Sequence, residues 1–373
     1  MRNLNVSSIL THTVTLTALF ISPATFANRT WDSANDPANM GNYNYNFDQL
    51  PTEGSMDLSR RGWSDTYWPF QLGMIAYRWQ VPNDEFRKDH SPDASAVFSL
   101  NEAEISQLSP AEKFDLARGD YQFTLGKKIR KETNPNARDW RGICNGWTQS
   151  SLNFDEPRPT VFTNKDGLKI PFGASDIKAL LAYYYAKEDN SPVSTVGRRC
   201  KQKSALAWTS AACSSMDVNA GSFHMIMANE LGIQHKGFAA DRDPFNEVWN
   251  QPYVKFESHV VNVLDKSKGD KLSRHASDAA VREITLSSDV YFADDDGIVP
   301  STEPYIGTDQ NKITKTVYNY VLDVDAAGQI IGGDWLDSNR PDFMWRQEFH
   351  KPTGDFEILE KIYEQSVHVF TNS

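Results

Sequence analysis

An odd number of cysteines, in a chain that begins like an exported protein, restricts this sequence more than any other feature. Its 373 residues contain three cysteines, Cys144, Cys200 and Cys213. In an oxidising compartment two can pair, which leaves one free thiol. Cys200 and Cys213 lie close together in a polar stretch, and we expect a disulfide between them; two buried free thiols are the alternative. Cys144 is then a lone thiol that is either inert and buried or used in chemistry.

The first 27 residues indicate export. Arg2 is followed by an apolar stretch over residues 14–21 and then by Pro-Ala-Thr-Phe-Ala at residues 23–27. A basic start, an apolar middle and small residues before the cut are typical of a secretory signal peptide over residues 1–27. A membrane anchor is the alternative, but threonine interrupts the apolar run. We therefore expect a secreted protein without a membrane span, extracellular or, in a Gram-negative bacterium, periplasmic.

Composition bounds the class of protein. The chain carries 38 Lys and Arg against 49 Asp and Glu, a formal net charge of −11. Nucleic-acid binding needs clustered basic residues, so we do not expect nucleic acid as a partner. The mixture of separate helices and hairpins indicates an α+β fold. We divide the mature chain into an irregular N-terminal arm, residues 28–60, and a single catalytic domain, residues 61–373.

Several segments have the pattern of scaffold rather than chemistry. A capping box at Ser109 and a glycine at position 119 bound one predicted helix, and Ser175 caps another. Alternating apolar residues predict a strand over residues 318–324. A final amphipathic helix is expected at about residues 355–368.

The sharpest local feature surrounds Cys144. Gly142 and Gly146 flank it, and it opens a run compatible with a short helix. A thiol at a helix N-terminus faces free backbone N–H groups and the positive end of the dipole, which lowers its pKa and favours thiolate. The glycines would let the backbone turn and a substrate carbonyl approach. The backbone N–H of Cys144 can be one oxyanion donor, while Trp140 and Arg141 are nearby candidates for the second.

A nucleophilic thiol needs a base, and the base needs an orienting acceptor. Among eight histidines, His224, His235 and His259 stand in suitable contexts. We expect His224 on a strand, followed by a glycine turn and a returning strand that ends at Asp241, whose carboxylate would accept the imidazole N–H. Apolar residues recurring every four positions over 223–231 also fit a short helix.

Other assignments stay open at this point. Taken alone, His224 is also explained as a satisfied core histidine. His259 is the runner-up base, with Asn250 as its orienter. Asp243 is a second candidate for the role given to Asp241.

Several segments resemble the elicitor-type transglutaminases, which are secreted, cell-wall-associated enzymes best known from oomycetes, with relatives in aquatic bacteria. They are residues 144–147 (Cys-Asn-Gly-Trp), 171–180, 223–224 (Phe-His), 248–252 (Val-Trp-Asn-Gln-Pro) and 332–335 (Gly-Gly-Asp-Trp). The resemblance extends from about residue 63 to residue 345. Val-Trp-Asn-Gln-Pro begins the segment that plants recognise in oomycete members, but the matching stretch is shorter here, so immune recognition is not carried over.

The resemblance implies a papain-like cysteine acyltransferase fold, with an antiparallel sheet packed against the helix that carries the nucleophile. It implies a Cys-His-Asp site, which maps to Cys144, His224 and Asp241. No cofactor is required for the chemistry, although family members are often calcium-dependent. The nearest candidate for Ca²⁺ is residues 294–297 (Asp-Asp-Asp-Gly), which falls short of an EF-hand loop and is otherwise a solvated acidic turn.

We therefore expect a protein-glutamine γ-glutamyltransferase whose partners are proteins with exposed Gln and Lys, or polyamines. A papain-like cysteine peptidase or a glutamine deamidase would use the same residues. A catalytically silent surface or wall-binding protein is the alternative from another class, and resistance of Cys144 to alkylation would favour it.

Overall fold

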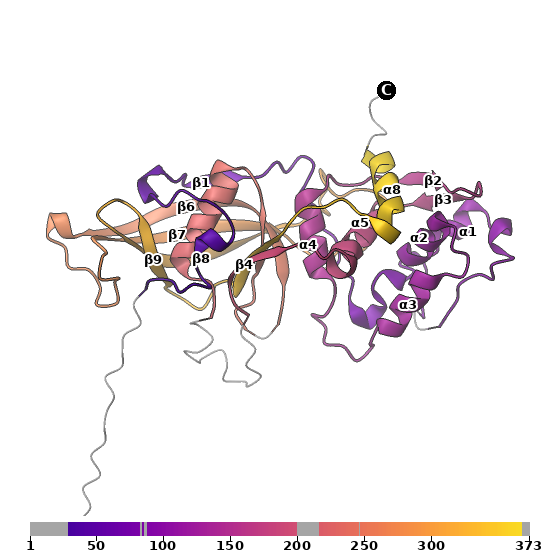
Figure 1. Ribbon diagram of the computed structural model, residues 1–373, viewed down its shortest axis with the longest axis horizontal. Coiled ribbons are helices and arrows are strands. Elements are labelled where there is room, and N and C mark those ends of the chain that lie inside the picture. Colours follow the sequence, from indigo (N-terminus) through magenta and orange to yellow (C-terminus); the bar gives the residue numbers. More distant parts are fainter. Residues whose placement is uncertain (1–28, 83, 86–87, 200–215, 246, 368–373) are drawn as a thin grey trace, which may run out of the picture.

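The computed structural model describes residues 29–82, 84–85, 88–199, 216–245 and 247–367. The predicted signal peptide and the predicted Cys200–Cys213 disulfide lie outside the described residues. Figure 1 shows a large twisted sheet at one end of the molecule and a group of helices at the other. No helix of the described part is long and apolar enough to cross a bilayer.

The large sheet is antiparallel throughout. Its strands run in the order β4 (Val193–Gly197), β10 (Phe343–Gln347), β5 (Phe238–Asp241), β6 (Asn250–Asp265), β7 (Arg282–Ala293), β8 (Ile313–Val324) and β9 (Ile330–Trp335). The short strand β1 (Glu53–Ser55) pairs with β6. The predicted strand over residues 318–324 is confirmed as part of β8, and the chain returns in β9.

One face of this sheet is covered by α7 (Ala220–Met227), which continues as a π-helical turn, η8 (Ala228–Ile233). Phe223 packs against Tyr318 and Trp335, with ring centroids 5.1 and 5.2 Å apart. The N-terminal arm contributes buried Met40, Tyr43 and Leu50 to this core. The arm is therefore packed against the sheet and contributes to its hydrophobic core.

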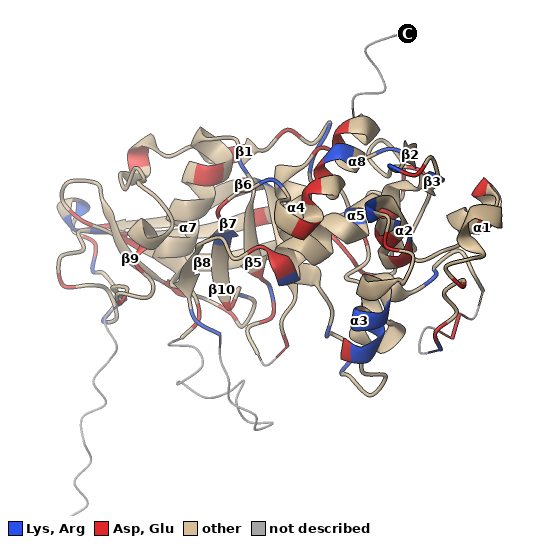
Figure 2. Ribbon diagram, turned by 45° about the vertical axis from the view of Figure 1, so that its right-hand side comes forward, with Lys and Arg blue, Asp and Glu red and all other residues tan. Residues whose placement is uncertain are grey.

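The helical end contains α1 (Glu102–Ser106), α2 (Pro110–Arg118), α3 (Thr124–Glu132), α4 (Cys144–Asn153), α5 (Ala174–Tyr183), the π-helical turn η6 (Tyr184–Glu188), α8 (Glu357–Val367) and the hairpin of β2 (Thr160–Thr163) and β3 (Lys169–Phe172). Short 3-10 turns lie at Pro37–Asn39, Phe47–Gln49, Phe70–Leu72, Met74–Ala76, Val97–Ser99, Lys266–Lys268 and Gly354–Phe356. Figure 2 shows basic residues gathered on α3.

One of the two predicted helix caps is confirmed, and the other is shifted by two residues. Ser109 caps α2 with a full capping box, and Gly119 ends it at φ 77°, in the left-handed region that glycine tolerates. The cap of α5 is Gly173 rather than Ser175. Asp176 explains the shift, because its carboxylate accepts a 2.8 Å hydrogen bond from the backbone N–H of Gly173.

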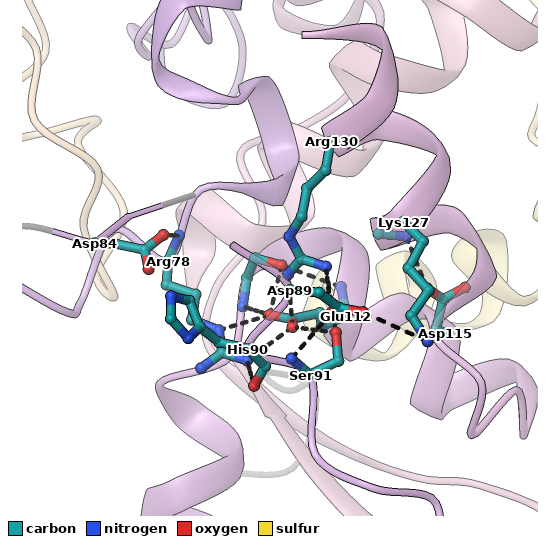
Figure 3. Close-up of polar contacts among 11 residues, drawn as sticks. Arg78, Asp84, Asp89, His90, Ser91, Glu112, Asp115, Lys127 and Arg130 are labelled. Carbon is teal, nitrogen blue, oxygen red and sulfur yellow. Dashed lines mark hydrogen bonds and ion pairs between the residues drawn. The ribbon is translucent and has the colours of Figure 1, made fainter. Parts of the chain in front are cut away.

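A buried carboxylate holds the helical end together (Figure 3). Glu112 of α2 is fully buried and accepts hydrogen bonds from Arg78 (2.8 Å), Arg130 (2.7 Å) and Ser91 (2.9 Å). Burial alone would raise its pKa, but the hydrogen bonds and charges of Arg78 and Arg130 lower the pKa of Glu112 to about 2. The ion cluster therefore ties the loop before α1 to α2 and α3.

Candidate active site

Cys144 is the first residue of α4, as its flanking sequence predicted, and α4 ends at Asn153. The helix packs against α5 on one side and against β5 and β6 on the other. It therefore lies where the helical end meets the sheet (Figure 1). The thiol is free and buried, with 5% of the residue exposed.

The two glycines around Cys144 are required by packing. A Cβ on Gly146 would lie 1.8 Å from the backbone oxygen of Ala182 in α5. A Cβ on Gly142 would lie 2.3 Å from the backbone oxygen of Tyr67. Only glycine permits these backbone contacts. The two glycines therefore allow the start of α4 to lie directly against the backbone of Ala182 and Tyr67.

The sulfur of Cys144 contacts the beginning of β6. Asn250 Nδ2 donates a hydrogen bond to Sγ at 3.6 Å, and the thiol donates to the backbone oxygen of Val248 at 3.8 Å. The amide of Asn250 is itself held, because Trp345 Nε1 donates to Oδ1 at 2.7 Å. Thr148, one turn along α4, donates to the backbone oxygen of Asn250 at 2.9 Å. Asn250 is thus a partner of Cys144, not the orienter of His259 that the sequence suggested.

Two buried carboxyl groups raise the pKa of the Cys144 thiol by their charge. Asp241 ends β5, and Asp295 follows β7; they are 0% and 2% exposed. Asp241 Oδ1 accepts from the backbone N–H of Trp249 at 2.8 Å, and Asp295 Oδ1 accepts from Gln251 Nε2 at 2.9 Å. The Oδ2 atom of each has no hydrogen-bond partner among the described residues.

Burial dominates the titration of all three groups. It raises the pKa of Asp241 to about 7 and that of Asp295 to about 7. It also raises the pKa of the Cys144 thiol to about 12, and the charges of Asp295 and, more weakly, Asp241 raise it further, against the hydrogen bonds from Asn250. The expected lowering of the thiol pKa is therefore wrong: burial raises the pKa, and Cys144 is protonated at rest.

His224 occupies a different place. It lies on α7, so the strand interpretation is wrong and the helical alternative is confirmed. Its ring is buried, with Nδ1 2.7 Å from the hydroxyl oxygen of Tyr320, and it stacks on Phe47 at 5.9 Å. Burial lowers its pKa to about 4, so the imidazole is neutral. Within the described residues, no hydrogen bond, ring contact or electrostatic interaction joins His224 to Cys144 or Asp241.

The other sequence candidates also lie outside the thiol's contacts. His259 is exposed on β6, and exposed His235 has Nδ1 3.3 Å from the backbone oxygen of Ser55. Asp243 donates its backbone N–H to Asp241 Oδ1 at 3.2 Å. The structure thus brings Asp241 near Cys144 and leaves the predicted histidine elsewhere.

The acidic turn at residues 294–297 does not fit a calcium site. Asp294 and Asp295 are buried, so the interpretation as a fully solvated turn is wrong for them. The Asp294 carboxylate accepts from the backbone N–H groups of Asp295 and Asp296 and from Thr314 Oγ1 at 2.7 Å. In the described part of the chain, no cluster of three or more His, Cys, Asp or Glu residues is arranged to hold a metal ion.

A cleft of about 770 Å³ opens beside Cys144. The loop between α3 and α4, the turn η6 and the start of β6 line it, and both Cys144 and Asn250 are among its lining residues. Tyr67 and Trp249 pack edge to face with centroids 5.6 Å apart next to this region. A substrate side chain entering the cleft would meet the thiol together with the amide that holds it.

Three of these residues were not assigned to the thiol from the sequence. Asn250 lies in the Val-Trp-Asn-Gln-Pro segment, so a signal existed, but it was assigned to another partner. Asp295 was considered only as a metal ligand. Trp345 had no local signal, because its partner Asn250 lies 95 positions away in the sequence.

Comparison with known proteins agrees with this fold. The family described as transglutaminase elicitor matches residues 40–358. The structure is similar to the crystal structure of the GP42 transglutaminase from Phytophthora sojae, with a TM-score of 0.64 and 19% sequence identity, over 90% of this chain and 97% of that one. No curated protein sequence matches the chain significantly.

Proposed function

The chain belongs to the transglutaminase elicitor family, and from that premise we propose that it is a protein-glutamine γ-glutamyltransferase with Cys144 as its nucleophile. One observation carries the assignment. A free thiol at the start of a buried helix shares its surroundings with an oriented amide, Asn250, and with carboxyl groups whose pKa values lie near 7. Such a group of nucleophile, donor and base is what acyl transfer requires.

The base in this proposal is a carboxylate instead of an imidazole. Asp295 is the first candidate, because its charge acts more strongly than that of Asp241 on the Cys144 thiol. A carboxyl group of pKa about 7 is partly ionised at neutral pH, so it can accept a proton and return it. The unpartnered Oδ2 of Asp295 is free to do so within the described structure. His224 is not part of this proposal, since its contacts are with Tyr320 and Phe47.

The first half-reaction forms a thioester. As the sulfur of Cys144 attacks the carboxamide carbon of a glutamine side chain, the Asp295 carboxylate takes the thiol proton. The oxyanion is stabilised by the backbone N–H of Cys144 and by Asn250 Nδ2, the second donor that the sequence left open. The C–N bond then breaks, and ammonia leaves with the proton that Asp295 returns.

The second half-reaction releases the product. A lysine or polyamine nitrogen attacks the thioester carbon, and the Asp295 carboxylate takes the proton that this nitrogen loses. The C–S bond breaks, and the sulfur recovers a proton from Asp295, which restores the resting thiol. With water in place of the amine, the same steps convert glutamine to glutamate.

The arrangement of helix and sheet is consistent with a papain-like acyltransferase. A helix that begins at the nucleophile packs against an antiparallel sheet, whose strands β5 and β6 bring Asp241 and Asn250 to the helix start. We further propose that the chain acts outside the cytoplasm, as the signal pattern of residues 1–27 and the secreted character of the family support.

The test is amine incorporation by the mature chain. A glutamine-rich protein and a fluorescent primary amine are incubated with wild-type enzyme and with Cys144→Ala, and the products are analysed by mass spectrometry. We expect amine attached to glutamine with wild type and none with Cys144→Ala. Glutamate without attached amine would instead indicate a deamidase, and cleaved backbone a peptidase. Full incorporation by Cys144→Ala would refute the assignment of the nucleophile.

A further inference from the structure

The cleft beside Cys144 differs in charge from the rest of the chain. The molecule carries 49 acidic and 38 basic residues. Yet the described residues that line this cleft include four basic side chains and no Asp or Glu; the basic ones are Arg138, Arg141, Lys187 and Arg199. A basic cleft in an acidic protein is a local departure that selects for a ligand of negative charge.

Most of these cations are not neutralised by the protein. Arg138, Arg141 and Lys187 are exposed and form no ion pair with any described residue. The buried arginines of the helical end are different, since Arg78 and Arg130 are both committed to Glu112. The charges of Arg138, Arg141 and Lys187 are therefore available to a ligand.

One aromatic ring, that of Phe70, holds two of these cations at the cleft. The guanidinium of Arg141 lies 5.2 Å from the ring centroid of Phe70, and the ammonium of Lys187 lies 5.1 Å from the same centroid. A ring orients a cation without using its N–H donors, which stay free for a carboxylate. The ring thus positions these cations and leaves their N–H donors free, whereas an ion pair within the protein would have occupied those donors.

The nearest acidic groups do not cancel this charge. Glu188, next to Lys187, forms a 3.1 Å ion pair with Lys128. Asp139, next to Arg138, is exposed and does not line the cleft. Asp241 and Asp295 are buried and do not line the cleft either. A ligand in the cleft therefore meets basic groups first.

From this arrangement we propose that the preferred acyl donor is an acidic peptide, with Asp or Glu on either side of the reactive glutamine. The inference rests on the proposed function, because it places the glutamine side chain at Cys144. The volume of about 770 Å³ is larger than one carboxamide fills and leaves room for the flanking residues. Arg138, Arg141 and Lys187 would bind the flanking carboxylates and so set the choice of donor.

The experiment compares two blocked peptides that differ only in charge. Each contains one glutamine, flanked on both sides by Asp in the first and by Asn in the second, and mass spectrometry confirms that the fluorescent amine is attached to the glutamine. We expect kcat/KM at low salt to be about tenfold higher for the Asp peptide, the factor that one additional charge-assisted contact supplies. The advantage should disappear at about 1 M salt, where the screening length falls to about 3 Å.

Charge-reversal variants locate the effect. Arg138→Glu and Lys187→Glu change exposed side chains and should each lower the Asp-to-Asn ratio, with inversion in the double variant. Lys268→Glu makes the same change at an exposed position in the turn that follows β6, and it should leave the ratio as in wild type. Equal rates for both peptides at low salt, or a ratio that the cleft variants do not alter, would overturn the inference while leaving transglutaminase activity established. Absence of incorporation into either peptide and into a glutamine-rich protein would instead count against the proposed function.

Discussion

Trp345 holds Asn250 in the orientation that Cys144 needs. Its indole Nε1 donates a 2.7 Å hydrogen bond to Oδ1 of Asn250, so the amide nitrogen points at the sulfur of Cys144, 3.6 Å away. Trp345 lies on β10, and β5 separates that strand from β6, which begins at Asn250. A residue from a strand two places away thus fixes which end of the amide faces the thiol.

Substitutions of Asn250 and Trp345 should distinguish the role of Asn250 as oxyanion donor from the role of Trp345, which orients the Asn250 amide. We expect Asn250→Ala to lower kcat by about 10²- to 10³-fold, the effect of losing one oxyanion donor. Trp345→Phe keeps most of the ring but loses the N–H, and we expect a smaller fall in kcat with little change in KM. Steady-state kinetics with a fixed glutamine peptide measures both.

Trp335→Phe is the matched control. Its indole also donates a hydrogen bond, to the backbone oxygen of Val218 at 2.8 Å, but this half-buried ring packs against Phe223 of α7. We expect wild-type kcat for Trp335→Phe. An equal loss in Trp335→Phe and Trp345→Phe would mean that indole hydrogen bonds matter only for the fold.

The pH dependence of the acylation step tests the carboxylate base. Because the pKa of Asp295 is raised to about 7, the base is protonated and inactive below that pH, and ammonia release should rise as the pH passes through about 7. Asp295→Asn should lower ammonia release by about 10²- to 10⁴-fold. The same variant removes a negative charge beside Cys144, so alkylation of the thiol should shift to lower pH.

These opposite effects identify a base only in a folded variant, because loss of burial would also lower the thiol pKa. The free energy of unfolding of Asp295→Asn, measured in urea, should therefore stay close to that of wild type. Asp241→Asn should shift the alkylation profile less, since the charge of Asp241 acts more weakly on the thiol. Normal ammonia release in Asp295→Asn would contradict its role, and loss in Asp241→Asn alone would transfer the role to Asp241.

The histidine expected from the sequence should be dispensable for chemistry. His224→Gln removes an imidazole that contacts Tyr320 and Phe47. We expect it to destabilise the fold by about 1–3 kcal/mol, as the loss of a buried hydrogen bond does, while kcat of the folded enzyme stays within a few fold of wild type. Urea unfolding and active-site titration with an alkylating reagent measure the two effects separately. A loss of kcat by several orders of magnitude in folded His224→Gln would restore the Cys-His-Asp interpretation.

The Glu112 cluster should control acid stability. The pKa of Glu112 is lowered to about 2 from an ordinary value of 4.5, so its contribution is present above about pH 4.5 and is lost as the pH falls toward 2. This shift corresponds to about 3 kcal/mol. Glu112→Gln should lower the free energy of unfolding by about that amount at pH 7 and by less at pH 3.

Glu102→Gln is the control for this change. Its carboxylate is exposed, and its ion pair with Lys169 is long, at 3.8 Å. Urea unfolding should give a free energy within about 0.5 kcal/mol of wild type. An equal effect of the two substitutions at pH 7 would show that the buried network adds nothing.

Local patterns predicted the scaffold well because local interactions determine it. The capping box at Ser109 predicted α2, and alternation of apolar residues predicted the strand that became β8. The helix start at Cys144 followed from its glycines and the polar run behind it. Each of these rests on contacts within a few residues along the chain.

The composition of the site could not be found in the same way. Asn250, Asp295 and Trp345 meet Cys144 or each other only because distant strands are adjacent in the sheet. The predicted pairing of His224 with the thiol depended on placing His224 on a strand. The apolar repeat around His224 belongs instead to the helix α7. The pKa of Cys144 depends on its burial, which no helix-terminus argument contains. Contacts between residues far apart in the sequence thus determine which side chains surround Cys144, and the motif around Cys144 does not contain that information.

The most direct test is to find the acyl group. The enzyme is incubated with a glutamine peptide without amine, quenched in acid and digested, and the fragment that carries the acyl mass is identified. We expect a hydroxylamine-sensitive acyl group on the fragment containing Cys144, and none in Cys144→Ala. An acyl group on Cys200 or Cys213, or undiminished amine incorporation by Cys144→Ala, would contradict it.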